Sequence, residues 1–266
     1  MSIALKFGIL ALLTGAAIIG IFAFQPIAQP VSYHRFADTR TFCRIPNFGN
    51  VVSNLPFILI GIIGLTTMGK RALSFGILAM YGVLFIGVIL TGLGSAYYHC
   101  NPNNDTLVWD RIPMTIVFMS LLSAVVAELI SGRLGFVLLI PLVGIGVGSV
   151  IWWHYTETMG QGDLRLYFLV QFYPMLVIPL LMWLFYKPDF GPVIRCLVWV
   201  VIWYVVAKVF EQLDYPIYRV IGISGHTLKH LAAALSTWYF LIIFRLRHQR
   251  LSEPSSWKFS SNPVRR

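Results

Sequence analysis

The chain has 266 residues, of which 58% are hydrophobic and 11% are charged; its mean hydropathy is +0.76 and its formal net charge is +10. A soluble domain carries about 25% charged residues, so a single soluble core is excluded and an integral membrane protein is indicated. The basic residues gather in short connections and in the C-terminal segment, which fits membrane topology rather than a nucleic-acid groove. The three cysteines form no CxxC pair and are too few for a disulfide scaffold.

Eight apolar runs, each close to the roughly 20 residues that cross a bilayer, predict an all-α polytopic transmembrane helical bundle. They cover residues 4–24, 51–69, 74–97, 111–130, 134–153, 166–186, 193–212 and 225–245. A signal peptide is the alternative for the first run. That run is long for a signal and is followed by a poor cleavage site, so we expect a retained helix.

The number of spans decides the topology. Eight spans place both termini on one side, which also carries most of the basic residues and few of the acidic ones, so this side is predicted to be cytoplasmic. Cys43 and Cys100 then lie on the opposite side, where a disulfide between them is allowed but not deducible. Cys196, at the cytoplasmic edge, is expected to be an apolar filler.

Polar residues meet the apolar runs at the predicted non-cytoplasmic edge. His99 ends the third run, Asp110 starts the fourth, and His226 and His230 open the eighth. A spacing of four residues puts His226 and His230 on one helix face, close enough to share a metal ion. Two unrelated histidines at a membrane interface are the alternative. Lys229, between them, is expected to point toward water.

Two further residues belong to the same edge. Ser95 precedes His99 by one helical turn, and its alternative role is that of a small residue in a glycine-rich helix contact. Asp110 has two alternative roles, as a helix N-cap or as a partner of Arg111. Ionisable residues inside a membrane are costly, however, and are functional by default when several of them cluster.

Three neutral histidines suit a catalytic zinc ion, which keeps its fourth position open. Such an ion activates a water molecule and polarises a carbonyl group. A neighbouring carboxylate can take the proton of the water and pass it to a leaving amine, and a serine hydroxyl can donate to the oxyanion. This set of groups predicts the hydrolysis of an amide or an ester.

Together these motifs resemble those of the alkaline ceramidase family, which belongs to a superfamily of seven-helix membrane hydrolases and progestin/adiponectin-type receptors. The motifs are Gly94-Ser95 with His99, the eleven-residue step from His99 to Asp110, and His226-x-x-x-His230. The segment Asn-Val-Val-Ser-Asn-Leu-Pro-Phe at residues 50–57 is also similar to the start of the first core helix of that family. The resemblance covers roughly residues 33–245.

The resemblance implies a role for each site residue. It makes His99, His226 and His230 the zinc ligands, Asp110 the group that orients and deprotonates the nucleophilic water, and Ser95 a helper at the substrate carbonyl. It implies cleavage of the ceramide amide into a sphingoid base and a fatty acid. It also divides the chain into an N-terminal transmembrane helix, a seven-helix hydrolase core and a basic cytoplasmic tail, at residues 1–30, 31–248 and 249–266.

The segment before residue 50 departs from the family pattern. Some eukaryotic members carry an acidic calcium site there, whereas residues 33–47 of this chain contain a single acid, Asp38, among three arginines. Calcium prefers several oxygen ligands, often carboxylates, so we expect no calcium site. Instead, a salt bridge from Asp38 to Arg35 or Arg40 is expected.

Other polar residues receive simpler predictions. We expect His34 and His154 to be interface residues rather than metal ligands, the latter beside an aromatic belt at Trp152-Trp153. Glu211 and Asp214 end the seventh run, where they are expected to line the cavity or to pair with Arg219.

The sequence thus predicts a zinc-dependent intramembrane hydrolase of ceramide or a related lipid amide, with the bilayer as its partner and no nucleic acid. Two alternatives stay open. A zinc-containing receptor of the same superfamily would bind a lipid amide without turning it over. A b-type haem electron carrier would show a Soret band, although two histidines four residues apart suit a compact ion better than the two faces of a porphyrin.

Overall fold

The computed structural model describes residues 1–69 and 73–252, with side chains up to residue 247. Lys70, Arg71 and the whole of the predicted tail at 249–266 therefore lie outside the described side chains. The described residues form helices without a β-strand beyond one isolated bridge between Phe42 and Ile45. The helices are α1 (Ile3–Phe22), α2 (Phe48–Val52), α3 (Leu55–Met68), α4 (Phe75–Cys100), α5 (Asn104–Leu129), α6 (Gly132–Thr158), α7 (Arg165–Leu184), α8 (Gly191–Gln212), α9 (Asp214–Ile221) and α10 (Gly225–Ser252).

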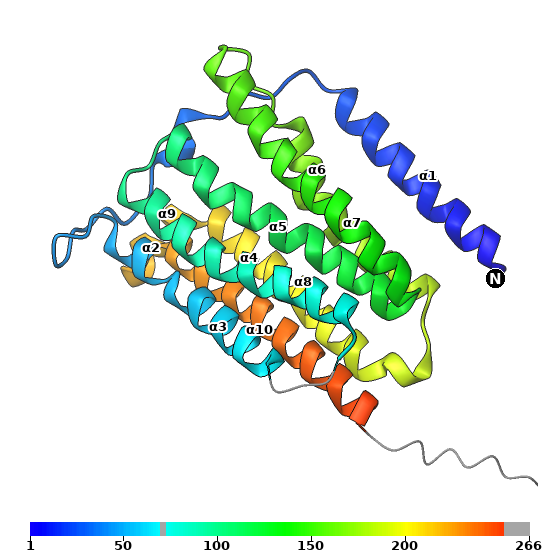
Figure 1. Cartoon of the computed structure of the whole chain (residues 1–266). Coiled ribbons are helices and arrows are strands. Elements are labelled where there is room, and N and C mark those ends of the chain that lie inside the picture. The colour runs from blue at the N-terminus through cyan, green and yellow to red at the C-terminus, as the bar shows by residue number, and fades with distance from the viewer. Residues whose placement is uncertain (70–72, 253–266) are drawn as a thin grey trace, which may run out of the picture.

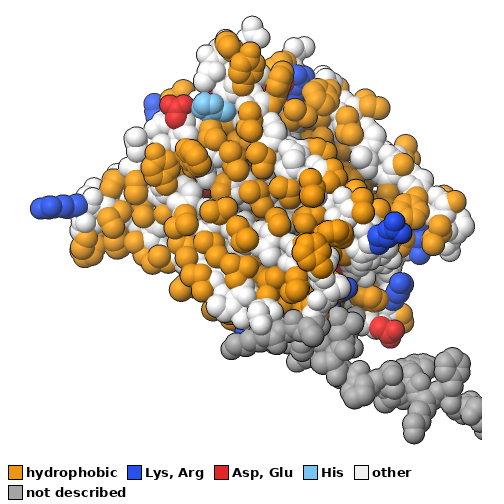
Figure 2. All heavy atoms as spheres, viewed as in Figure 1, with side chains coloured by type: hydrophobic (Ala, Val, Ile, Leu, Met, Phe, Trp, Pro, Cys, Tyr) orange, Lys and Arg blue, Asp and Glu red, His pale blue; other side chains and the backbone are white. Residues whose placement is uncertain are grey.

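Eight helical stretches within the described ranges are long and apolar enough to cross a membrane, as the sequence predicts. Two of them include a short preceding element: α2 with α3 forms Phe48–Met68, and a 3₁₀ turn with α8 forms Pro188–Gln212. Figure 2 shows hydrophobic side chains over most of the viewed face, with lysines and arginines toward its margins. The protein is therefore an all-α, multi-pass membrane bundle.

Helix α5 lies at the centre of the bundle, and 78% of its membrane-length window is buried. Three residues separate its start from the end of α4. Asn103 caps it: the Asn103 side chain accepts a hydrogen bond from the backbone N–H of Thr106, and the Thr106 hydroxyl accepts one from the backbone N–H of Asn103. This tight connection makes α4 and α5 antiparallel neighbours. It brings the last turn of α4 beside the first turns of α5.

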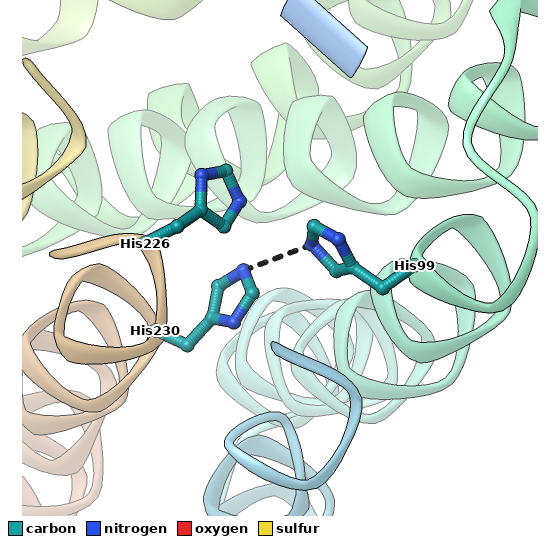
Figure 3. Close-up of side chains that lie close together, drawn as sticks. All are labelled: His99, His226 and His230. Carbon is teal, nitrogen blue, oxygen red and sulfur yellow. Dashed lines mark hydrogen bonds between the residues drawn. The ribbon is translucent and has the colours of Figure 1, made fainter. Parts of the chain in front are cut away.

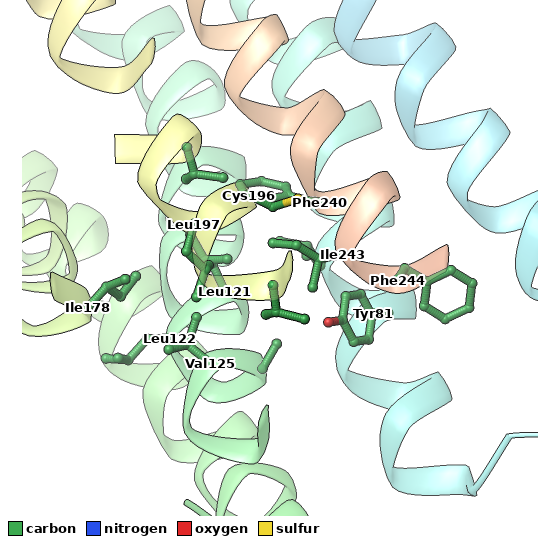
Figure 4. Packing of buried hydrophobic residues seen from close by; sticks show 14 of the residues in the cluster. Tyr81, Leu121, Leu122, Val125, Ile178, Cys196, Leu197, Phe240, Ile243 and Phe244 are labelled. Carbon is green, nitrogen blue, oxygen red and sulfur yellow. The ribbon is translucent and has the colours of Figure 1, made fainter. Parts of the chain in front are cut away.

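The apolar core packs between α4, α5, α7, α8 and α10 (Figure 4). Leu84, Phe85, Ile178, Leu241 and Phe244 are almost completely buried there, with 0% of their surface exposed. Edge-on contacts between aromatic rings, such as Phe85 with Phe244, fill the space between α4 and α10. This core fixes the relative rotation of the helices that carry the polar residues.

Helix α1 lies on the outside of this core, against which its partly buried Ile9, Leu10 and Leu13 pack. None of its residues is buried, and it runs along the outside of the bundle beside α7 (Figure 1). One hydrogen bond of 2.7 Å joins its Thr14 hydroxyl to the Tyr173 hydroxyl on α7. α1 is therefore attached to the surface of the bundle and takes no part in its interior.

Candidate metal centre and substrate cavity

Three histidines from two helices meet at one end of the bundle. His99 lies in the last turn of α4, and His226 and His230 lie in the first two turns of α10. Their rings face one another with all three pairs of centroids 4.9 Å apart (Figure 3). They are 0%, 5% and 3% exposed, so the cluster is screened from solvent.

The geometry of these rings fits a zinc ion. Nε2 of His99 lies 3.3 Å from Nε2 of His230, and one ligand atom from each of the three histidines lies within 4.8 Å of the other two. Two imidazole nitrogens bound to the same tetrahedral zinc would lie about 3.3–3.4 Å apart. Among the residues that the structure describes, none is a hydrogen-bond partner of the buried Nδ1 of His99. The donor set and the spacing both suit a metal ion held by three histidines.

Asp110 lies in the second turn of α5 and is 5% exposed, and it lines the same cavity as the buried Ser95. Both alternatives for Asp110 are wrong. The N-cap of α5 is Asn103, and Arg111 turns away to donate to the Gln29 side-chain oxygen at 2.6 Å. Asp110 is therefore free to act in the cavity that it lines.

This cavity contains about 940 Å³ of empty space, its opening included. Its polar end is formed by Ser95, Asp110, Glu211, Lys229 and His230. Toward the membrane interior its wall becomes apolar, with residues such as Phe57, Val88, Leu121, Val200 and Phe240. The polar groups and a long apolar chamber are thus continuous.

A comparison with protein-family models gives one match, to the family described as Ceramidase, over residues 41–262. The chain belongs to the ceramidase family. It is therefore an enzyme that hydrolyses amide bonds, and the family implies a lipid substrate. The match begins after α1, which agrees with a helix added to the outside of the core. Comparisons with curated proteins and with solved structures gave no match.

In this ceramidase, the segment at residues 50–57 orients His230. The Ser53 hydroxyl donates to the carbonyl oxygen of Asn50 at 3.1 Å and contacts Nδ1 of His230 at 2.8 Å. Because its single proton is used on Asn50, the hydroxyl oxygen must accept from Nδ1–H. That choice leaves the lone pair of Nε2 facing the cluster, as a metal ligand requires.

His226 is placed by Asp214, at the junction of α8 and α9. One carboxylate oxygen of Asp214 accepts the backbone N–H of His226 at 3.0 Å and the Ser224 hydroxyl at 2.5 Å. The prediction that Asp214 lines the cavity or pairs with Arg219 is therefore wrong. A carboxylate at this position satisfies free N–H groups at the start of α10, where the helix dipole favours negative charge.

The glycines beside Ser95 account for the close helix contacts of α4. A side chain at Gly92 would meet Ile58 of α3, and one at Gly94 would meet the backbone carbonyl of Trp109 on α5. Ser95 itself lines the cavity together with Asp110. The packing role suggested for Ser95 thus belongs to its glycine neighbours.

Lys229 does not reach toward water, and that prediction is wrong. Its ammonium group lies 2.9 Å from one oxygen of Glu211, whose other oxygen lies 2.5 Å from Lys208. The carboxylate on α8 draws the lysine into the bundle, because a buried ion pair avoids the cost of an unpaired buried charge. Glu211 lines the cavity as expected, but its partners are these lysines and not Arg219.

Phe36 covers the histidines, a role that no pattern in the sequence indicates. Its ring centroid lies 4.7 Å from those of both His99 and His226, and the residue is 5% exposed. The residues that follow Phe36 hold the covering segment in place, since the Ala37 N–H donates to Asp214 at 2.9 Å and Arg40 donates to the Gly222 carbonyl at 2.9 Å.

The same segment contains the expected salt bridge of Asp38. Arg40 is the partner, at 2.6 Å, and its hydrogen bonds hold the pKa of the Asp38 carboxyl below its usual range. His34 lies nearby but bonds to Tyr98 and Asn104, both at 2.9 Å. His34 therefore has no place among the three clustered histidines.

The remaining sequence predictions concern the interface and the cysteines. His154 pairs with Asp105 at 3.0 Å beside exposed Trp152, as a residue of the membrane interface would. Cys43 and Cys100, between which the sequence allows a disulfide, are both exposed free thiols in the structure. Cys196 is buried in the apolar core.

Proposed function

We propose that this ceramidase-family protein hydrolyses the amide bond of ceramide, or of a closely related lipid amide, at a zinc ion held by His99, His226 and His230. The observation that carries the proposal is the buried three-histidine cluster beside a cavity that also presents Asp110 and Ser95. Such a cluster with a neighbouring carboxylate is the donor set of a hydrolytic metal centre.

The chemistry of the donors supports zinc. Imidazole nitrogens suit zinc, copper, iron and nickel, and three of them with an open fourth position are typical of catalytic zinc. A bound zinc ion would supply a water nucleophile at neutral pH and would polarise the amide carbonyl. The direct contact of 3.3 Å between His99 and His230 leaves no room for a porphyrin between them, which argues against a haem carrier.

Asp110 moves the proton in this proposal. Its carboxylate takes a proton from the attacking water and gives it to the nitrogen of the leaving sphingoid base, which must depart as an amine. Ser95 lines the cavity with Asp110 and brings a hydroxyl beside the scissile carbonyl. Both groups are buried, so their positions are set before the substrate arrives.

The cavity suggests how a lipid reaches these groups. On the side of the connecting segment, Phe36 covers the histidines and closes access to them. On another side, three residues that line the cavity are partly exposed: Met175 on α7, and Tyr204 and Lys208 on α8. We place the mouth between α7 and α8, facing the bilayer. The hydrocarbon chains then lie against the apolar wall while the amide meets the polar end.

The orientation in the membrane follows from charge. Both termini are proposed to be cytoplasmic and the histidines to lie toward the opposite side, since basic residues concentrate on the cytoplasmic side. With α1 outside the family match, the proposed division remains residues 1–30 for the added helix, 31–248 for the hydrolase core and 249–266 for the tail.

The test combines metal analysis with turnover. Protein purified in detergent should contain one zinc per chain and release fatty acid from ceramide, and removing the metal should abolish the release. His226→Ala and His230→Ala should lose most of the zinc, because three protein ligands are the minimum for a stable site. Full zinc content in either variant would show that the ligands are assigned incorrectly. Zinc-loaded wild type that releases no fatty acid from any lipid amide would refute the activity.

A further inference from the structure

Lys229 is a buried cation at the polar end of the cavity, beside the groups proposed to carry the reaction. It lines the cavity together with Ser95, Asp110 and His230. Its Nζ lies 3.3 Å from Nε2 of His226, and its side chain is 15% exposed. A lysine placed so close to a histidine cluster is unexpected, because like charges in a low-dielectric interior repel a bound cation.

Glu211 explains why the ammonium group stays there. One of its oxygens holds Lys229 at 2.9 Å and the other holds Lys208 at 2.5 Å, while the Tyr33 hydroxyl contacts it at 3.4 Å. The Glu211 side chain is only 10% exposed. The position of Lys229 is therefore fixed by a charged partner on another helix, and not by rotamer preference alone.

The ammonium group has hydrogen-bond capacity to spare. A lysine has three donors, of which one points to Glu211 and one is within reach of His226. When the lone pair of His226 Nε2 binds a ligand of its own, it no longer accepts from Lys229. At least two donors of Lys229 then remain for an oxygen atom in the cavity.

We infer that Lys229 is a catalytic residue that binds the carbonyl oxygen of the scissile amide, and that it also binds the carboxylate of the fatty acid product. This inference rests on the proposed function. During hydrolysis the water oxygen bonds to the carbonyl carbon and the C=O π electrons move onto the carbonyl oxygen. Asp110 receives the proton of the water. When C=O forms again, the C–N bond breaks and Asp110 returns the proton to the nitrogen. Lys229 keeps its protons and stabilises the oxygen that carries negative charge.

Lys208 provides a matched control. It is bound to the same carboxylate and lines the same cavity, but its side chain is 31% exposed and it contacts the ring of Phe172 at 5.8 Å from the centroid. It thus lies at the proposed mouth, and it makes no direct hydrogen bond to a histidine among the described residues. Removing either lysine leaves Glu211 with one cationic partner, so both variants lose the same number of ion pairs.

The experiment compares Lys229→Met with Lys208→Met in detergent-purified protein. Three quantities are measured: zinc content, kcat and KM for a neutral lipid amide, and the equilibrium affinities for a long-chain fatty acid and for the corresponding fatty alcohol. For Lys229→Met we expect unchanged zinc, a fall in kcat of about 10²–10³-fold as for a lost oxyanion donor, and a similar KM. Its affinity for the fatty acid should fall at least about tenfold, with that for the alcohol unchanged, because only the carboxylate needs the ammonium group.

Lys208→Met should change kcat and fatty-acid affinity much less. The inference is overturned if Lys229→Met keeps its kcat and its fatty-acid affinity, if it loses zinc in proportion to activity, or if Lys208→Met shows the same losses. If Lys229→Met fails to fold, the same measurements are made on Lys229→Gln, which can still donate to Glu211. The expected losses of kcat and of fatty-acid affinity are then smaller. If wild type turns over no lipid amide, the proposed function fails, and the comparison of fatty acid with alcohol still tests Lys229 separately.

Discussion

Replacing Ser53 by alanine should weaken metal binding without touching a ligand. The Ser53 oxygen accepts from Nδ1–H of His230 at 2.8 Å and so keeps the lone pair of Nε2 directed at the cluster. Without that acceptor, the amide nitrogen of Asn54 still lies 3.5 Å from the same Nδ1. Because that nitrogen is a donor, it favours the tautomer in which Nδ1 carries the lone pair and Nε2 carries the proton.

The expected magnitude follows from this change of tautomer. Loss of a partner that orients a metal-bound histidine typically costs about 10–100-fold in metal affinity, which corresponds to about 1.4–2.7 kcal/mol. The lost hydrogen bond should also lower the free energy of unfolding by about 0.5–1.5 kcal/mol. A competition titration of zinc against a chromophoric chelator measures the first quantity in detergent-purified protein.

Ser123→Ala is the matched control. The Ser123 hydroxyl is likewise buried and donates to the Gly135 carbonyl at 2.8 Å, between α5 and α6 and away from the cavity. This variant should lose stability to a similar extent while keeping wild-type zinc affinity. Equal zinc affinities for Ser53→Ala and Ser123→Ala would refute the assignment of the His230 tautomer.

Three further predictions address the chemistry, the covering segment and the topology. Asp110→Asn should keep its zinc and lose about 10²–10⁴-fold in kcat, since the amide cannot take a proton; near-wild-type turnover would leave Asp110 without a catalytic role. Asp38 has a pKa lowered by its guanidinium partner, so its contribution to stability is complete above the unfolded pKa of about 3.9 and is lost as pH falls through the lower folded value. Asp38→Asn should therefore lower Tm at pH 6, and the Tm difference from wild type should shrink as pH falls below about 3.9; a Tm difference that does not change with pH would contradict this. An impermeant maleimide should label the exposed Cys43 from outside the cell, and after the native cysteines are replaced by serine, Ser255→Cys should react only in permeabilised cells. The opposite labelling pattern would place the histidines on the cytoplasmic side.

The sequence was sufficient for the spans and for the meeting of the three histidines. Hydropathy locates each crossing, and the direction of each crossing follows from their number, so residues at the ends of spans can be assigned to one edge. The spacing of His226 and His230 then determines a common face. The structure confirms eight spans and brings His99 to the other two histidines.

Contacts that depend on helix rotation could not be deduced in this way. The prediction for Lys229 was wrong because its side chain is long enough to reach either water or a carboxylate. Which of the two it reaches depends on where α8 places Glu211. The spacing of Lys208 and Glu211, three residues apart on a membrane helix, is a signal that could have indicated a buried ion pair. Ser53 lay in a recognised motif, but its contact with His230 joins two distant segments.

Phe36 had no signal of its own, because one phenylalanine in a connecting segment does not differ from the other apolar residues nearby. Its position bears on how an ion held by the histidines would exchange. A ring that rests on both His99 and His226 closes one side of the cluster, so a water-soluble chelator could approach on that side only after the segment lifts. Lifting it breaks the Ala37–Asp214 hydrogen bond and the contact of Arg40 with the Gly222 carbonyl. The other approach is through the cavity, whose proposed mouth faces the bilayer. Water-soluble chelators should therefore remove such an ion slowly, at a rate limited by the opening of this segment.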